Sequence, residues 1–335
     1  MVDLLGFAGI SLVCLITFII GIRFPSVSKI LFVALIIRVS ILIIGQYVIT
    51  LPDSTADATS IEQTARRIAE NGFFNLLDYY PGPGTMFVRW LIAIPYSIFG
   101  PSSLMAKSMS LFFGMGSVFL GWKLANEFLN SQIANKVGWV IALFPSLILY
   151  SALTMRAAYI SFFLLVALYG VVDWSQTRKL KSICLAMIGF IAATFFHGAS
   201  LVGAIAFIGI IAFVSFKDLI QSLKSYRISL KNLFLIILLM YVIILYLSNE
   251  IYVPYIRDFQ FVTDPDILLR KTRVSVIGEA AYPDWTIANS PIELIYKLPI
   301  RSIYFLFAPF PWSVNEVKHL IGMFDGFLYM YLTFL

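Results

Sequence analysis

Long apolar runs recur along most of this chain, and they restrict its fold more than any other feature. A lipid bilayer offers no water to backbone polar groups, so only helices and closed barrels can span it. The alternation and turn density of a barrel are missing here, while 60% of the residues are hydrophobic and 13% are charged. We therefore predict an all-α polytopic membrane protein, with residues 1–335 forming a single integral-membrane domain.

The lengths of the runs predict about nine transmembrane helices, because about 20 apolar residues cross the hydrocarbon layer. The expected spans are 4–22, 30–50, 108–126, 137–154, 157–173, 183–199, 200–216, 232–248 and 319–335. The chain stops inside an apolar run at Leu335. This leaves a truncated product, without its later spans, as a second interpretation.

Basic residues in the short connections predict the orientation of the spans. Two, two, three and four Lys or Arg residues occur in the connections 23–29, 123–136, 174–182 and 217–231. Short loops rich in these residues stay in the cytoplasm, which places 51–107 outside as a first outer loop and 249–318 outside as a second. This orientation requires the apolar stretch 84–99 to lie in the outer interface, or to dip back, instead of crossing.

A charged segment in the first outer loop, residues 51–72, holds four carboxylates and two arginines in an otherwise oily chain. Such a concentration of charge indicates that this segment binds or acts on a polar group at the membrane surface. Within it, apolar residues recur at helical spacing at Ile61, Ala65, Ile68 and Ala69. Together with a glycine stop at Gly72, this spacing predicts a short amphipathic helix over 57–71 on the outer surface.

Asp57 lies at the start of that expected helix, near the membrane. One interpretation is that its carboxylate only caps the helix. The other is that it takes a proton from an acceptor hydroxyl or helps to hold a metal-bound phosphate. Asp53 competes for the same role, although it follows Pro52 at the end of a span.

Four later residues are candidates for binding phosphate. Arg156 is either a snorkelling anchor or a guanidinium that binds a phosphate or diphosphate head group in bidentate fashion. His197 is either a hydrogen-bonded core histidine or a proton exchanger with a leaving phosphate or an attacking hydroxyl. Arg270 and Arg273 in the second outer loop suit anionic lipid head groups, and a solvated basic face is the alternative.

The remaining composition argues against several kinds of site. Cys14 and Cys184 both fall in apolar runs and are interpreted as small hydrophobic residues. The chain has two histidines and no Cys/His cluster, so we expect no structural zinc site. The net charge of +6 fits membrane topology and requires no nucleic-acid partner.

Residues roughly 30–175 resemble the glycosyltransferase C superfamily in its first outer loop and following span. The residues that carry this resemblance are Asp57, Ala65, Gly72, Tyr80-Pro-Gly-Pro-Gly84 and Phe99–Ser110. Members are membrane enzymes that use polyprenyl-phosphate-linked sugars, and the loop aspartate that matches Asp57 is their catalytic carboxylate. This chain departs from the pattern in having an extra span before the loop. Ala157 and Ala158 also stand where a second acidic residue often follows Arg156, so the resemblance implies no metal-bridged carboxylate pair.

A second resemblance, over about 145–210, is to the Wzy- and EpsG-type polymerases of O-antigen and exopolysaccharide. Met155-Arg-Ala-Ala-Tyr-Ile-Ser161, a basic connection and Phe195-Phe-His-Gly-Ala-Ser-Leu201 carry it. An arginine and a histidine at these places handle the lipid diphosphate in such proteins. The resemblance therefore implies that role for Arg156 and His197.

Both resemblances imply a membrane glycosyltransferase of surface-polysaccharide biosynthesis in the bacterial inner (plasma) membrane. It would transfer or polymerise saccharide units from a polyprenyl phosphate or diphosphate carrier at the outer face. Asp57 would be the general base and His197 would orient or protonate the leaving phosphate. Arg156, with Arg270 or Arg273, would neutralise that phosphate. No cofactor is certain, and a divalent metal is an open alternative.

The expected partners are the polyprenyl-linked saccharide, membrane lipid and other polysaccharide-assembly proteins. A flippase or transporter of the lipid-linked glycan is the alternative function. Such a protein needs polar residues through the middle of the membrane and often has an internal repeat. Here Arg38 is the only charge well inside a clear span, and no repeat is visible.

Overall fold

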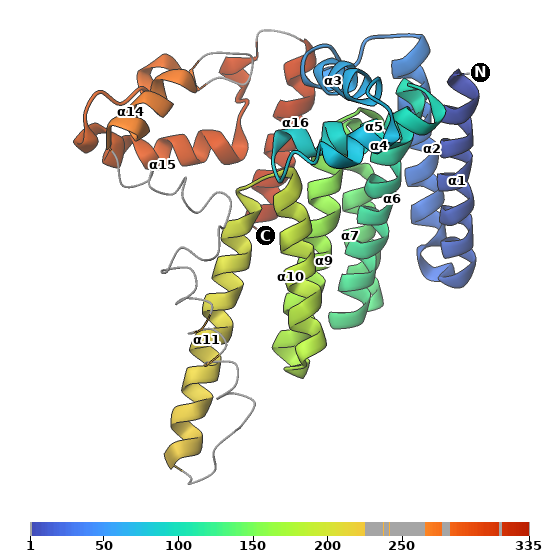
Figure 1. Cartoon of the computed structure of the whole chain (residues 1–335). Coiled ribbons are helices and arrows are strands. Elements are labelled where there is room, and N and C mark those ends of the chain that lie inside the picture. The colour runs from blue at the N-terminus through green and yellow to red at the C-terminus, as the bar shows by residue number, and fades with distance from the viewer. Residues whose placement is uncertain are drawn as a thin grey trace.

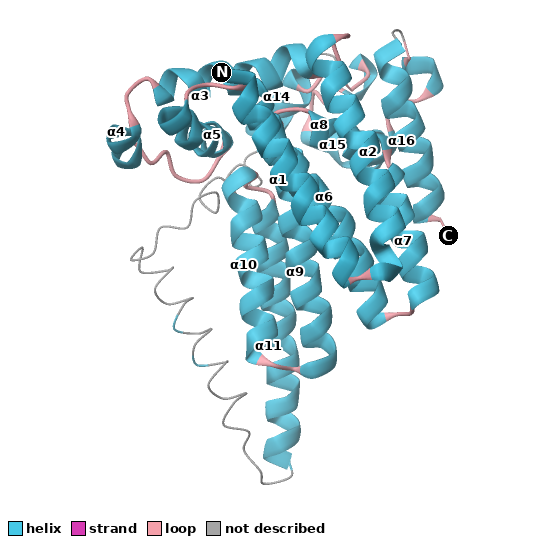
Figure 2. Cartoon of the chain, turned by 90° about the vertical axis from the view of Figure 1, so that its right-hand side faces the viewer, coloured by secondary structure: helices cyan, strands magenta, loops and turns pink. Residues whose placement is uncertain are grey.

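The computed structural model describes residues 2–224, 265–276, 282–314 and 317–334, together with residues 237 and 241. Regular structure in these ranges is entirely helical. Five of the helices there are long and apolar enough to cross a membrane. They are α1 (Val2–Arg23), α2 (Pro25–Tyr47), α6 (Ser103–Phe128), α9 (Ala157–Thr177) and α11 (Ser200–Lys224). The arrangement is consistent with a polytopic membrane protein (Figures 1 and 2).

The expected count of about nine spans is wrong for the described part of the chain. It holds five candidate spans, or six if α7 (Ser131–Leu143) and α8 (Pro145–Ala152) form one span bent by 55°. The helices α10 (Leu180–Phe196) and α16 (Val317–Thr333) have 17 residues each, about the lower limit for crossing the hydrocarbon layer. The expected span 232–248 lies outside the described residues, apart from 237 and 241.

Helix α6 runs through the middle of the bundle and packs against α1, α2, α7, α8 and α9 (Figure 2). Small residues allow this close packing. A Cβ added at Gly114 of α6 would come within 2.3 Å of the Cβ of Ser151 on α8. Helices in lipid associate through such close contacts, because the surrounding lipid supplies no hydrophobic drive between them.

The neighbouring helices α9 and α10 form a tight antiparallel hairpin. A Cβ added at Gly170 would lie 2.4 Å from the backbone nitrogen of Ala186, and one at Gly189 would lie 2.4 Å from that of Ala167. The two backbones therefore touch at two levels. This contact also fixes the residue before α9, Arg156, relative to the residue after α10, His197.

Arg38, a buried arginine of α2, donates hydrogen bonds to the chain at the break between α7 and α8. Pro145 has no N–H, and α7 ends at Leu143, so the last carbonyls of α7 lack helical partners. The Arg38 guanidinium donates to the carbonyl oxygens of Ala142 at 2.7 Å and Ile141 at 3.0 Å. Its side chain is 0% exposed. Arg38 therefore joins α2 to this break.

Three shorter helices lie across one end of the bundle (Figure 1). They are α3 (Thr59–Ala69), α4 (Phe73–Asp78) and α5 (Thr85–Phe99). Because α2 ends and α6 begins at this same end, α5 does not cross the bundle. Helix α3 packs against α5 and buries the apolar face expected from its spacing, at Ile61, Ala65 and Ile68.

The first of these helical segments starts earlier than the sequence suggested. Asp53 adopts a left-handed φ of 61° and leads into one wide turn, η1 (Ser54–Ala58), that continues into α3. The turn is started by Ser54, whose N–H and hydroxyl both donate to the carbonyl of Leu51, at 3.2 and 2.6 Å. Asp57 is therefore inside a helical turn and does not cap a helix, which corrects the capping interpretation.

The described residues of 249–318 are largely helical. Helix α14 (Pro265–Val274), a short turn η3 (Asp284–Thr286), helix α15 (Pro291–Phe307) and a second turn η4 (Pro311–Ser313) follow one another. Helix α16 packs against both α15 and α8. This contact joins the C-terminal helices to the bundle.

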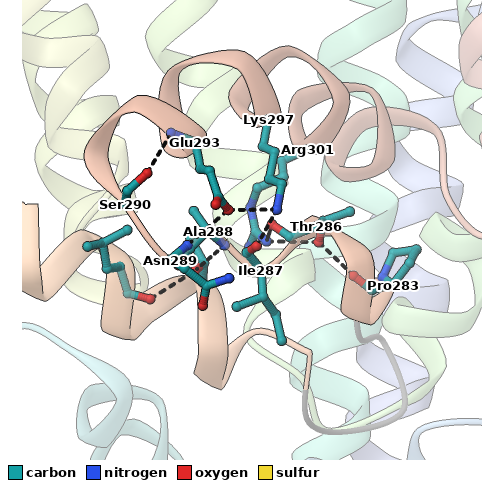
Figure 3. Close-up of polar contacts among 11 residues, drawn as sticks. Pro283, Thr286, Ile287, Ala288, Asn289, Ser290, Glu293, Lys297 and Arg301 are labelled. Carbon is teal, nitrogen blue, oxygen red and sulfur yellow. Dashed lines mark hydrogen bonds and ion pairs between the residues drawn. The ribbon is translucent and has the colours of Figure 1, made fainter.

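A network of polar contacts holds α15 to the turn before it (Figure 3). Ser290 caps α15 by accepting the Glu293 N–H at 3.2 Å. Lys297 Nζ donates to Glu293 at 3.0 Å and to the carbonyl of Ile287 at 2.6 Å. Arg301 donates to the carbonyl of Thr286 at 3.1 Å. Lys297 and Arg301 therefore hold α15 against the segment that precedes it.

Candidate functional site

Several connections meet at the end of the bundle that α3, α4 and α5 cover (Figure 1). The N–H of Gly84, between α4 and α5, donates to the carbonyl of Phe195 at 3.0 Å. The Phe87 ring packs on the rings of Phe195 and Phe196, with centroids 5.0 and 5.2 Å apart. The helices that cover this end are thereby fastened to the end of α10.

A cleft of about 600 Å³, here named the polar cleft, lies between the end of α2, the segment η1–α3 and the start of α6. Its polar side chains are Gln46, Thr50, Ser54, Thr55, Thr59, Glu62, Gln63, Arg66, Ser103 and Lys107. Charge of both signs is thus available at a surface next to apolar spans.

Glu62 organises one wall of the polar cleft. Its Oε1 atom accepts the hydroxyl of Thr154 at 2.6 Å and that of Ser103 at 3.0 Å. On the facing side, Lys107 Nζ donates to Gln46 Oε1 at 2.6 Å. Thr154 is 0% exposed, so Glu62 satisfies a hydroxyl that water does not reach. The contacts join α3 to α6 and to the connection between α8 and α9.

Sequence reasoning missed both Glu62 and Lys107. Glu62 directly follows Ile61 on the border of the buried face of α3, and this position was the available signal. The expected span begins at residue 108 and so excludes Lys107, whereas α6 begins at Ser103. The extra turn places Lys107 inside the helix and over the cleft.

Arg156 and His197 come together at the same end of the hairpin. Arg156 directly precedes α9, and His197 directly follows α10. The pKa of His197 is lowered from its ordinary value near 6.5, first by partial burial and then by the positive charge of Arg156. The pair therefore presents one cation and one mainly neutral imidazole, and an anion that binds there would relieve the electrostatic strain on a protonated His197.

The two candidate aspartates differ in their surroundings, since Asp53 directly precedes the turn η1 and Asp57 lies within it. Asp57 is exposed, in the same turn as Ser54 and Thr55, which line the polar cleft; Asp57 itself is not a lining residue. Asp53 accepts the hydroxyl of Tyr150 at 3.2 Å. The structure thus fixes the Asp53 carboxylate and leaves that of Asp57 in water.

Arg270 and Arg273 are placed apart from this group. Both lie on α14, and both are exposed. Neither lines the polar cleft. Their assignment to lipid phosphate stays a prediction.

Among the residues that the structure describes, no group of three or more His, Cys, Asp or Glu side chains is placed to hold a metal ion. Cys14 and Cys184 are free thiols. Comparison with protein-family models, with curated proteins and with solved structures finds no match to this chain.

Proposed function

We propose that this chain is a membrane glycosyltransferase of surface-polysaccharide biosynthesis in the bacterial inner membrane. It transfers or polymerises saccharide units from a polyprenyl phosphate or diphosphate carrier at the outer face. The observation that carries the proposal is the placement of Arg156, before α9, and of His197, after α10, at one end of the packed α9–α10 hairpin. Arg156 is two residues from Thr154, which bonds to Glu62 of the polar cleft.

A lipid-linked sugar phosphate matches this distribution of groups. Its polyprenyl chain can stay in the hydrocarbon layer, while its phosphate lies at the boundary where Arg156 and His197 are found. A guanidinium can hold two phosphate oxygens at once. Arg156 is half-buried, and partial shielding from water strengthens such an electrostatic contact relative to bulk water.

The transfer step needs a base and an acceptor for negative charge. The acceptor hydroxyl oxygen bonds to the anomeric carbon as the carbon–oxygen bond to the carrier phosphate breaks, and the phosphate leaves with the electron pair. In the proposal Asp57 takes the hydroxyl proton, with Asp53 as the competing base. Arg156 neutralises the leaving phosphate, and His197 donates a hydrogen bond or a proton to it. Arg270 and Arg273 are proposed as further contacts to the lipid phosphate.

The contacts of Arg38 support an enzyme over a flippase. A conduit for a polar head group needs polar groups that are free to face the substrate along the span. The guanidinium of Arg38 instead donates to the carbonyls of Ile141 and Ala142 and has no exposed surface. The polar groups of the cleft lie at one end of the bundle.

Mass spectrometry of lipid-linked and surface glycan, from a strain that lacks this gene, tests the proposal. Chains capped with a single complete repeat would identify a polymerase, and a polymer that lacks one side sugar would identify a monosaccharide transferase. Lipid-linked glycan trapped on the inner leaflet would identify the flippase alternative. Unaltered glycan would refute the polysaccharide proposal.

Binding of inorganic pyrophosphate to the purified full chain tests the phosphate contacts directly. Arg156→Gln should weaken binding by about tenfold or more, because a charge-assisted contact is lost. Arg67→Gln is the matched control, since Arg67 is an exposed arginine of α3 and is not one of the residues proposed to bind phosphate. Equal affinities of the two variants would refute the role of Arg156.

A further inference from the structure

A second pocket, of about 620 Å³, is lined by none of Asp57, Arg156 and His197. Residues of α8, α15 and α16 line it, together with the turn that carries Asp53. We name it the acidic pocket. Its polar lining consists of Asp53, Ser146, Tyr150, Tyr282, Tyr304, Ser313, His319 and Asp325, and none of the described residues that line it is a Lys or Arg.

Asp325 and His319 bring buried polar atoms without partners to this pocket. Asp325 is only 9% exposed, and neither of its carboxylate oxygens accepts a hydrogen bond from the described residues. Ser146 lies next to the carboxylate without a hydrogen bond of acceptable geometry. Both ring nitrogens of His319 are buried and likewise unbonded within the described ranges. Buried polar atoms are normally paired, so a ligand with hydroxyl or amide groups is the expected partner.

The charge of the lining restricts the class of ligand. Two carboxylates and no cation make the acidic pocket unfavourable for a phosphate. An organic cation needs acceptors alone, whereas this lining mixes acceptors with the hydroxyl and imidazole donors of Ser313 and His319. A ligand that both donates and accepts hydrogen bonds, and carries no charge, fits this mixture.

Aromatic rings complete the lining of the acidic pocket, and neighbouring side chains hold two of these rings in place. The Arg301 guanidinium lies 4.2 Å from the centroid of the Tyr282 ring, and the Trp312 indole N–H donates to the Tyr304 hydroxyl at 3.1 Å. Both tyrosines line the acidic pocket. Fixed aromatic faces with a few convergent polar groups are typical of small-ligand sites, and such faces can pack against the C–H face of a sugar ring.

The acidic pocket and the polar cleft share a wall. Pro52 and Asp53 line the pocket, while Ser54 and Thr55 line the cleft. On α8, Tyr150 faces the pocket, and Leu153 at the end of that helix faces the cleft. A saccharide in the acidic pocket would therefore lie across one turn of chain from the polar cleft.

We propose that the acidic pocket binds an uncharged saccharide, with Asp325 and His319 bonded to its hydroxyls and Tyr304 packed against its ring. The choice of a saccharide among uncharged polyhydroxyl ligands rests on the function proposed above. In this proposal the saccharide is the glycan part of the substrate, and Asp53, the competing base, lines the pocket that holds it. Arg156 and His197 hold the phosphate part.

Saturation-transfer difference NMR on the full chain in nanodiscs tests this proposal. The probes are glucose, galactose, mannose and N-acetylglucosamine at millimolar concentration, with ethanolamine as the cationic probe. At least one sugar should receive saturation from the protein. Asp325→Asn should weaken its apparent affinity by about tenfold, because a charged acceptor is lost. Asp284→Asn is the control, since Asp284 is an exposed aspartate that does not line the pocket.

A second variant, Tyr304→Leu, removes an aromatic face and should also weaken the sugar signal, with folding checked by size-exclusion chromatography. Saturation of ethanolamine alone, or of no probe, would overturn the saccharide assignment. So would an equal loss in the Asp284→Asn control. Pyrophosphate binding at Arg156 is measured on the same samples. Its retention in the absence of sugar binding would reject the acidic pocket while leaving the proposed function in place.

Discussion

Replacing Gly170 with alanine should weaken the chain more than the same change at Gly209. Gly170 lies in the contact between α9 and α10, where an added Cβ would be 2.4 Å from the nitrogen of Ala186 and 2.8 Å from the carbonyl oxygen of Ser182. An added Cβ at Gly209 of α11 would meet nothing within 4 Å. The two substitutions therefore differ in one respect, the presence of a neighbouring backbone.

The magnitude follows from these distances. Ordinary contact begins at 3.4 Å, so α10 must move by about 1 Å from α9, and the atoms it meets belong to the backbone. Overpacking of this kind costs about 1–3 kcal/mol, while Gly→Ala inside a helix contributes about 0.5–1 kcal/mol of stability. The difference of the two ranges is a net loss for Gly170→Ala of about 0–2.5 kcal/mol in the free energy of unfolding. Gly209→Ala should raise it by about 0.5–1 kcal/mol.

Thermal unfolding in detergent, followed by fluorescence-detected size-exclusion chromatography, compares the two variants with the unmodified chain. Pyrophosphate affinity supplies a second readout, because the hairpin that holds Gly170 also positions Arg156 and His197. That affinity should fall in Gly170→Ala and stay constant in Gly209→Ala. An equal or higher midpoint for Gly170→Ala than for Gly209→Ala would refute the close backbone contact between α9 and α10.

Three further changes test other parts of the structure. Glu62→Ala leaves the buried Thr154 hydroxyl without its acceptor and should cost about 1–3 kcal/mol of stability; Glu62→Gln keeps an acceptor oxygen and should cost less in the same thermal assay. The pKa of His197 lies below 6.5 in the free chain, and a bound anion raises it. The affinity for pyrophosphate should therefore rise as the pH falls through the pKa of the bound state, and it should level off below the pKa of the free state. His197→Gln should remove this part of the pH dependence, and an identical profile for both proteins in calorimetry would contradict it. Asn130→Ala removes the acceptor of the Ile133 N–H at 2.9 Å and should lower stability by about 1 kcal/mol, whereas Asn130→Asp, which keeps an acceptor, should match the unmodified chain.

The membrane character and the amphipathic helix could be predicted from sequence because both are local properties. Apolar runs of sufficient length predict helices in lipid, and the spacing of Ile61, Ala65 and Ile68 predicts the buried face of α3. The number of spans could not be predicted in this way. The break at Pro145 depends on how α7 ends and α8 begins, which hydropathy does not register.

Some residues of the candidate site could likewise be predicted from sequence, and others could not. Sequence alone singled out Arg156 and His197 as polar residues at the ends of apolar runs, because a charge there is costly without a use. Only the tertiary structure shows that the α9–α10 hairpin places them together. Glu62, Lys107, His319 and Asp325 line pockets that are built from helices far apart in the chain, and no local pattern shows those pockets. Their positions follow from packing between helices, and this packing decides which isolated polar residues share a pocket.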